Sequence, residues 1–318
     1  MNTKELFFVS LLALMAAWYS WRDMAAEPDQ IAWNTRIISE AAVIEGCAIP
    51  PYRYRLANTA LRLGAEKVWG WVDSPLLRWT NAQVTVYGIA AWVAFTGAFL
   101  FWRRLVPGSE LFSCAMLSAI LPATNVHPWD AGDLITLAGF SMGMWAGTTG
   151  RAWMIPPFCA VMATNREQGF LLPVFVAAWA ISSRDYRPLR WCAAAIAVHF
   201  VVQIAMTEYA GYVPSAFTAA FHLRRNFATP DAAMHTIGLW VSQVIPFFVL
   251  AAVSWRLQTR AMRVWLLMLF PYIAAYSVKG YLWEGQKFLP AFLFLLPAVW
   301  LALRGVIATT AQVPRQPR

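Results

Sequence analysis

The sequence is divided into apolar segments that are long, or nearly long, enough to cross a bilayer, with short charged loops between them. A transmembrane helix needs about 20 apolar residues, and fewer where it ends inside a protein-lined cavity. This pattern predicts an all-α fold, a polytopic transmembrane helical bundle that forms a single integral membrane domain over residues 1–318. We expect about 10 spans, near residues 5–21, 81–102, 110–124, 131–148, 152–164, 168–182, 190–208, 236–254, 263–279 and 288–305.

The composition excludes an ordinary soluble domain. Only 13% of the residues are charged and 59% are hydrophobic, whereas a soluble domain carries about 25% charge. The net charge of +9 is spread between apolar segments without a basic stripe, so we expect no nucleic-acid partner. The four cysteines have no metal-ligand spacing, which disfavours a zinc site. The apolar N-terminus has no small-residue cleavage site, and it is interpreted as an uncleaved first helix.

Charge sets the predicted orientation. With the N-terminus in the cytoplasm, the alternating spans place 13 of the 25 basic residues in inside segments and leave only three of the 16 acidic residues there. This is the positive-inside pattern of membrane proteins. The outer face then carries five polar segments, near residues 22–80, 125–130, 164–168, 209–235 and 279–287. Any chemistry is therefore expected on the outer face.

The first outer segment, residues 22–80, is long and contains two amphipathic stripes. They predict two juxtamembrane helices that lie on the membrane surface, with apolar positions at Trp33, Ile37, Ala41 and Ile44, and at Leu61, Ala65, Val68 and Val72. The alternative is that both helices are spacers. Between them, Arg53 and Arg55 could clamp a phosphate or could anchor lipid headgroups.

Three carboxylates, Asp23, Glu27 and Asp29, follow the first span at the outer mouth of the bundle. A carboxylate in this position could deprotonate an acceptor or hold a divalent cation, Mg or Mn, against a diphosphate. Solvated loop acids are the alternative.

Two short outer turns carry further candidates. In NVHPWDAGDL, His127 and Asp130 could form a polar pair at a cavity rim, although Asp130 or Asp133 could equally cap the next helix. In TNREQ, Arg166 and Glu167 stand next to apolar sequence on both sides. Charges at such depth are tolerated where they are paired or line a wet cavity.

The last two outer segments add cations and one acid. Arg224 and Arg225 lie among aromatic residues, and Glu284 and Lys287 precede the last span. Each could bind a phosphate or lie at the membrane interface, as a snorkelling lysine does. Together the five outer segments place both signs of charge on one face, which is expected of a site for a phosphorylated, lipid-borne substrate.

The layout resembles the GT-C class of membrane glycosyltransferases, which have a first span, a long outer loop with an acidic residue and membrane-parallel helices, and then many spans. The stretches PPYRYRLA, HPWD, TNREQGFLLP and WEGQKFLP are similar to motifs of small bacterial members. The resemblance implies a protein of the bacterial inner membrane with an extracytoplasmic active site. Its implied partners are a polyprenyl-phosphate sugar donor, a glycan or lipid-linked acceptor, and membrane lipids.

On this resemblance the catalytic acid falls on Asp29, Asp23 or Glu27. We favour Asp29 because it directly precedes the first amphipathic helix, and Glu40 on that helix is the next candidate. The family's NRE motif matches Asn165, Arg166 and Glu167, with Gln168 where threonine is commoner. Lys287 stands where arginine is usual, which puts a bidentate phosphate contact there in doubt.

Two other functions are compatible with an outer-facing charged site. An O-antigen polymerase or ligase usually has its large outer loop late in the chain, whereas here the largest comes first. A lipid-linked glycan transporter or flippase predicts internal symmetry and polar residues at mid-span, and the sequence has no repeat.

Overall fold

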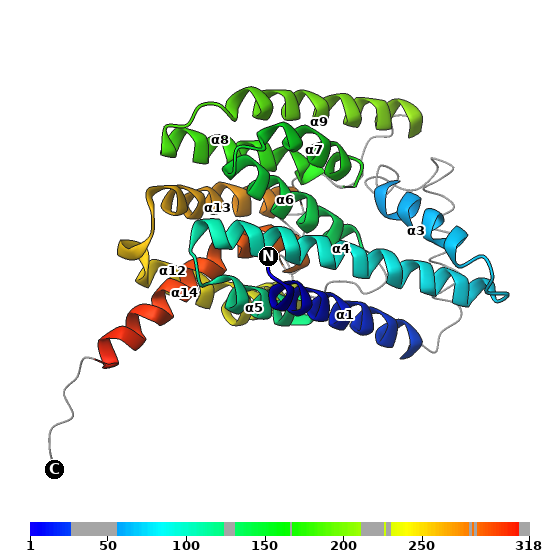
Figure 1. Ribbon diagram of the computed structural model, residues 1–318, viewed down its shortest axis with the longest axis horizontal. Helices are drawn as coiled ribbons and strands as arrows, with labels where there is room; N and C mark the ends of the chain where they lie inside the picture. Colours follow the sequence, from blue (N-terminus) through cyan, green and yellow to red (C-terminus); the bar gives the residue numbers. More distant parts are fainter. Residues whose placement is uncertain are drawn as a thin grey trace, which may run out of the picture.

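The computed structural model describes residues 1–26, 56–123, 131–165, 167–210, 226, 230–279, 282 and 285–311. These residues form a bundle of helices and contain no strand (Figure 1). The longer helices are α1 (Thr3–Ala26), α4 (Pro75–Leu105), α6 (Gly132–Thr148), α9 (Leu189–Ala210), α13 (Arg260–Lys279) and α14 (Leu289–Ala311). The shorter ones are α3 (Leu56–Val68), α5 (Glu110–Ala123), α7 (Ile155–Ala163), α8 (Leu171–Ser183), α11 (Pro230–Leu239) and α12 (Ile245–Val253). A π-helical turn, Trp240–Val244, joins α11 to α12.

Every segment expected to span the membrane contains a helix. Some helices extend five or six residues beyond the expected bounds: α1 continues to Ala26, α4 begins at Pro75, α11 begins at Pro230 and α14 continues to Ala311. The sequence explains the start of α4, because Ser74 caps it by accepting a hydrogen bond from the Leu77 N–H at 3.4 Å and Pro75 occupies the first turn.

Four of the described helical stretches are long and apolar enough to cross a membrane: Pro75–Leu105, Leu189–Tyr209, Thr236–Val253 and Leu289–Ile307. Their surfaces support the same interpretation. On α9, the side chains of Phe200, Val201 and Ile204 are exposed, and most of the apolar window of this helix is not buried in the protein. Exposed apolar surface of this extent fits lipid contact, so the fold is that of a helical membrane protein.

The centre of the bundle is the contact between α4 and α6. At Gly97 an added Cβ would lie 2.6 Å from Ser141 Oγ and 2.8 Å from the Met142 backbone nitrogen. Ser141 Oγ donates a hydrogen bond to the Ala94 carbonyl at 3.1 Å. A small residue on one helix and a hydroxyl on the other are the usual means by which helices pack closely in membranes.

The helix predicted from the second amphipathic stripe is present as α3. Arg62, on the polar side of that stripe, is only 4% exposed and faces the protein. It pairs with Glu66 at 2.9 Å and its guanidinium lies 5.6 Å from the centre of the Trp79 ring. The apolar Leu61 and Val68 are exposed instead. A helix at a membrane surface can direct apolar residues toward lipid and keep a paired charge against the protein. The first stripe, residues 33–44, lies outside the described residues.

The bundle has two ends that differ in composition. We call the end where α4 and α6 begin the Asn165 end, and the end where they finish the Arg104 end. α4 runs between the two ends and α1 packs alongside it, while α9 lies against α7 at the edge of the bundle and also extends toward the Asn165 end (Figure 1). The ends of α4, α6 and α8 and the start of α13, which border predicted inside loops, lie together at the Arg104 end.

Candidate functional site

The turn that contains TNREQ is held by a buried asparagine. Asn165 is 2% exposed, and its Nδ2 donates hydrogen bonds to the Gly132 carbonyl at 2.5 Å and to Thr136 Oγ1 at 2.8 Å. Its backbone N–H donates to the Met162 carbonyl at 3.0 Å. Asn165 therefore fixes the turn to the N-terminal part of α6.

The same turn anchors the flank of the first outer segment. The Ala57 N–H donates to the Thr164 carbonyl at 3.2 Å, and Ala57 is two residues after Arg55 in the sequence. On another side, Gln203 Nε2 of α9 donates to the Ala163 carbonyl at 2.6 Å. Helices from three distant parts of the chain thus meet at the TNREQ turn.

A second set of contacts joins the last two outer segments. Asn226, which directly follows Arg225, is buried, and its Oδ1 accepts a hydrogen bond from the Leu282 N–H at 3.0 Å. Trp240 Nε1 donates to the Leu282 carbonyl at 3.0 Å. Asn226, the residue that follows the Arg224–Arg225 pair in the sequence, is therefore held against the segment that leads into α14.

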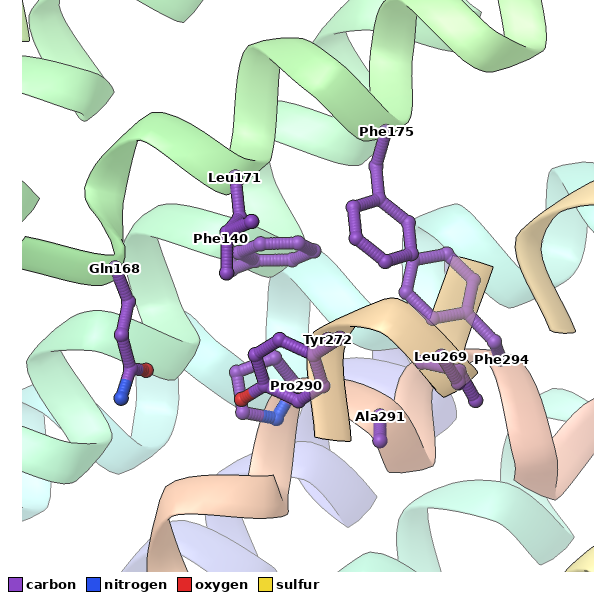
Figure 2. A pocket seen from close by; sticks show the side chains of 9 residues that line it. All are labelled: Phe140, Gln168, Leu171, Phe175, Leu269, Tyr272, Pro290, Ala291 and Phe294. Atoms are coloured by element: carbon purple, nitrogen blue, oxygen red, sulfur yellow. The ribbon is translucent and has the colours of Figure 1, made fainter. Parts of the chain in front are cut away.

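The TNREQ turn also lies near α13 and the start of α14. Tyr272 Oη donates to the Lys287 carbonyl at 2.5 Å. Figure 2 shows Gln168 at the edge of a small pocket that Tyr272 and Pro290 also line. The space open to a water molecule is about 10 Å³, enough for one water. It is too small for a sugar or a lipid headgroup, so it is not itself a substrate site.

These contacts bring the described flanks of all five predicted outer segments to the Asn165 end. The TNREQ turn is also recessed. Because Ala163 binds Gln203 and α9 continues seven residues further to Ala210, the turn lies about 10 Å short of the end of α9 at a rise of about 1.5 Å per residue. A polar turn at this depth is expected to face protein or a wet cavity rather than lipid.

Most of the predicted site residues lie outside the described part of the chain. They are Asp29, Glu40, Arg53, Arg55, His127, Asp130, Arg166, Arg224, Arg225 and Glu284, together with Glu27. The structure gives the backbone but not the side chain of Asp23 in α1 and of Glu167 in the 3-10 turn Glu167–Phe170. Asn165 and Lys287 are described, and both lie at the Asn165 end, with Asn165 buried and Lys287 half-buried.

One expectation for the second outer turn needs correction. The sequence offers Asp133 as a cap for the next helix, but the N-cap position of α6 is Ala131, which makes no side-chain cap bond. Asp133 lies inside the first turn and is only 4% exposed. The N-terminal end of a helix stabilises a nearby carboxylate. Asp133 is therefore a buried acid beside the residue that Asn165 binds.

Sequence reasoning also missed Gln83 of α4. This side chain is 0% exposed, and neither its Oε1 nor its Nε2 has a hydrogen-bond partner among the residues described. Ser141 of α6 binds the Ala94 carbonyl of α4, which sets the level of one helix against the other. Gln83 lies eleven residues before Ala94, and Gly132 lies nine residues before Ser141. Since α4 and α6 run in the same direction, Gln83 is about 3 Å beyond the level of Gly132. The only sign of this residue in the sequence is that a glutamine stands inside a long apolar segment.

Electrostatics at this end combine a buried acid, a buried paired arginine and an unsatisfied amide. Within the described ranges, no group of three or more histidine, cysteine, aspartate or glutamate side chains could hold a metal ion. The divalent cation stays a prediction that depends on acids of the first outer segment.

Comparisons with protein-family models, with curated proteins and with solved structures found no match to this chain.

Proposed function

We propose that the protein is a glycosyltransferase of the GT-C type, which transfers a sugar from a polyprenyl-phosphate donor to a glycan or lipid-linked acceptor outside the cytoplasm. The observation that supports this proposal is the gathering of the described flanks of five polar segments at one end of an apolar bundle. Asn165, Asn226 and Gln203 make the contacts that bring them together. A lipid-borne phosphorylated substrate needs such a place, with charge at the membrane edge and apolar surface beside it.

In the proposed reaction, the carboxylate of Asp29 removes a proton from an acceptor hydroxyl. The hydroxyl oxygen then forms a bond to the anomeric carbon of the donor with inversion, and the bond from that carbon to the phosphate oxygen breaks. The polyprenyl phosphate leaves with the electron pair. Arg55, Arg166 and the Arg224–Arg225 pair stabilise the growing charge on the phosphate, an effect that is strongest away from bulk water.

The proposed topology has about ten spans, a cytoplasmic N-terminus and the Asn165 end on the periplasmic side of the inner membrane. The short helices α7 and α8 fit it, because they meet at the recessed turn and need not reach the far surface. A magnesium or manganese ion, if one is used, would be held by acids of the first outer segment against the donor phosphate.

Asp29→Asn tests the assignment of the base. We expect this variant to lose transfer from a polyprenyl-phosphate sugar in proteoliposomes by at least a hundredfold, with unchanged expression and elution, because the amide cannot accept the proton. Asp73→Asn is the matched control and retains activity. Full activity of Asp29→Asn would move the base to Glu40 or Asp23.

Arg166→Lys tests the phosphate contact separately. Lysine keeps the charge but loses the planar pair of donors, so we expect donor binding to weaken at least fivefold. Unchanged donor binding would remove Arg166 from the phosphate site. No transfer from any of a panel of polyprenyl-phosphate sugars by the wild-type protein would contradict the proposed function as a whole.

A further inference from the structure

A second polar site lies at the opposite end of the bundle, where the sequence indicated only short basic loops. It is a depression of about 310 Å³ formed by the last turns of α4, α6 and α8 and the first turn of α13. Its charged residues are Arg104 and Arg260, and four hydroxyl side chains surround them: Thr148, Ser182, Ser183 and Thr259.

Neither arginine has a counter-ion among the described residues, unlike Arg103 next to Arg104 in the sequence. Arg103 pairs with Glu5 at 2.5 Å and with Glu110 at 3.5 Å. Arg104 and Arg260, in contrast, are exposed and form no ion pair or hydrogen bond through their side chains with any residue the structure describes. The described residues that line the depression include no acid. Two cations therefore face an open space without neutralisation.

Helix ends change this balance only partly. Each helix C-terminus carries roughly half a negative charge and each N-terminus half a positive one. Three C-termini and one N-terminus meet here, so the two arginines still leave the depression positive by about one elementary charge. At the start of α13, Thr259 Oγ1 accepts a hydrogen bond from the Met262 N–H at 3.3 Å, which leaves its O–H free to donate to a ligand.

The floor of the depression is apolar and aromatic. Phe101 and Trp265 are buried there, and Trp265 Nε1 donates to the Phe175 carbonyl at 2.8 Å. Trp179 also lines the wall. Arg104 is the residue before the end of α4, a helix long and apolar enough to span the membrane. The site is therefore expected at the depth of lipid headgroups, with apolar surface on the side of the acyl chains.

We propose that this depression binds the phosphate of an anionic phospholipid, with Arg104 and Arg260 as its ligands. Basic pockets between membrane helices recognise lipid headgroups in this way. A charge-assisted contact from guanidinium to phosphate is stronger than a neutral hydrogen bond, and the aromatic floor would contact the glycerol and the first carbons of the chains. The proposal does not depend on the sugar-transfer function, because the site lies at the other end of the bundle.

The test is native mass spectrometry of the full-length protein in detergent, titrated with phosphatidylglycerol, phosphatidylcholine or inorganic phosphate. Wild-type protein is expected to bind phosphatidylglycerol at least tenfold more tightly than phosphatidylcholine. The double variant Arg104→Gln with Arg260→Gln is expected to lose this preference. Arg304→Gln removes one charge from the exposed part of α14 outside the depression, and it changes the affinity less than twofold.

A second variant fills the site without changing its charge. Ser183→Phe adds a ring where an exposed serine lines the depression, and we expect it to lower phosphatidylglycerol binding at least fivefold. Equal binding by wild type and the double variant would overturn the proposal. Binding of inorganic phosphate without binding of phosphatidylglycerol would also overturn it, since the ligand would then be a free anion and not a lipid.

Discussion

Asn165 and Gly132, 33 residues apart in the sequence, are joined by a buried hydrogen bond of 2.5 Å from the Asn165 side-chain amide to the Gly132 carbonyl. The same amide donates to Thr136 Oγ1. One side chain thus connects the TNREQ turn to the helix that follows NVHPWD. The position of the proposed phosphate-binding turn depends on this contact.

Replacing Asn165 with alanine should destabilise the protein and disturb the turn. The change leaves the buried Gly132 carbonyl with one partner fewer, which costs about 1–3 kcal/mol. The expected result is a lower midpoint of thermal unfolding in detergent together with weaker donor binding. Asn81→Ala is the matched control, because Asn81 is less buried and its side chain makes no hydrogen bond with a described residue. Equal losses in the two variants would contradict a positioning role for Asn165.

The close packing of α4 on α6 predicts a strong effect at Gly97. An alanine Cβ would lie 2.8 Å from the Met142 backbone nitrogen, which cannot move without moving α6. Overpacking of this kind costs about 1–3 kcal/mol, so the midpoint of thermal unfolding should fall. Gly64→Ala in α3 is the control. An added Cβ there meets nothing within 4 Å, and the variant should be as stable as wild type or up to about 1 kcal/mol more stable.

Gln83→Leu separates stability from function. The amide has no partner among the described residues, so its replacement by a side chain of similar size should leave the thermal midpoint unchanged or raise it. If the amide serves the proposed site, sugar transfer should fall at least tenfold at the same time. Transfer at the wild-type rate would show that Gln83 has no part in the reaction.

Gln258→Leu provides the comparison within the same chain. Gln258 is also buried, but its Nε2 donates to the Ala251 carbonyl at 2.5 Å and to Ser254 Oγ at 2.8 Å. This variant should therefore lower the thermal midpoint, while its transfer rate at a temperature where it is folded should stay near that of wild type, because it lies at the Arg104 end.

The proposed orientation can be tested by cysteine labelling in a Cys47→Ser background. Trp71 and Tyr186 are exposed and lie at opposite ends of the bundle, and the cysteines at 114, 159 and 192 are buried. An impermeant maleimide added to intact spheroplasts should label Trp71→Cys and should label Tyr186→Cys only after lysis. Labelling of both before lysis, or the reverse order, would contradict a cytoplasmic N-terminus with alternating spans.

The sequence alone determined the helical class and the position of the helices, because apolar length and charged breaks are local properties. It also indicated that α3 is a helix, from the spacing of Leu61, Ala65 and Val68. Which side of α3 faces the protein could not be predicted this way. The burial of Arg62 depends on Glu66 and on Trp79 of another helix, and a helical stripe does not distinguish a face toward lipid from a face toward protein.

The tertiary structure alone decided which polar residues meet. No periodicity links Asn165 to Gly132, Ala57 to Thr164 or Asn226 to Leu282, because these contacts depend on how distant helices pack. The basic depression between Arg104 and Arg260 is of the same kind. Each arginine by itself is an ordinary loop cation, and only the meeting of four helix ends creates an unneutralised site.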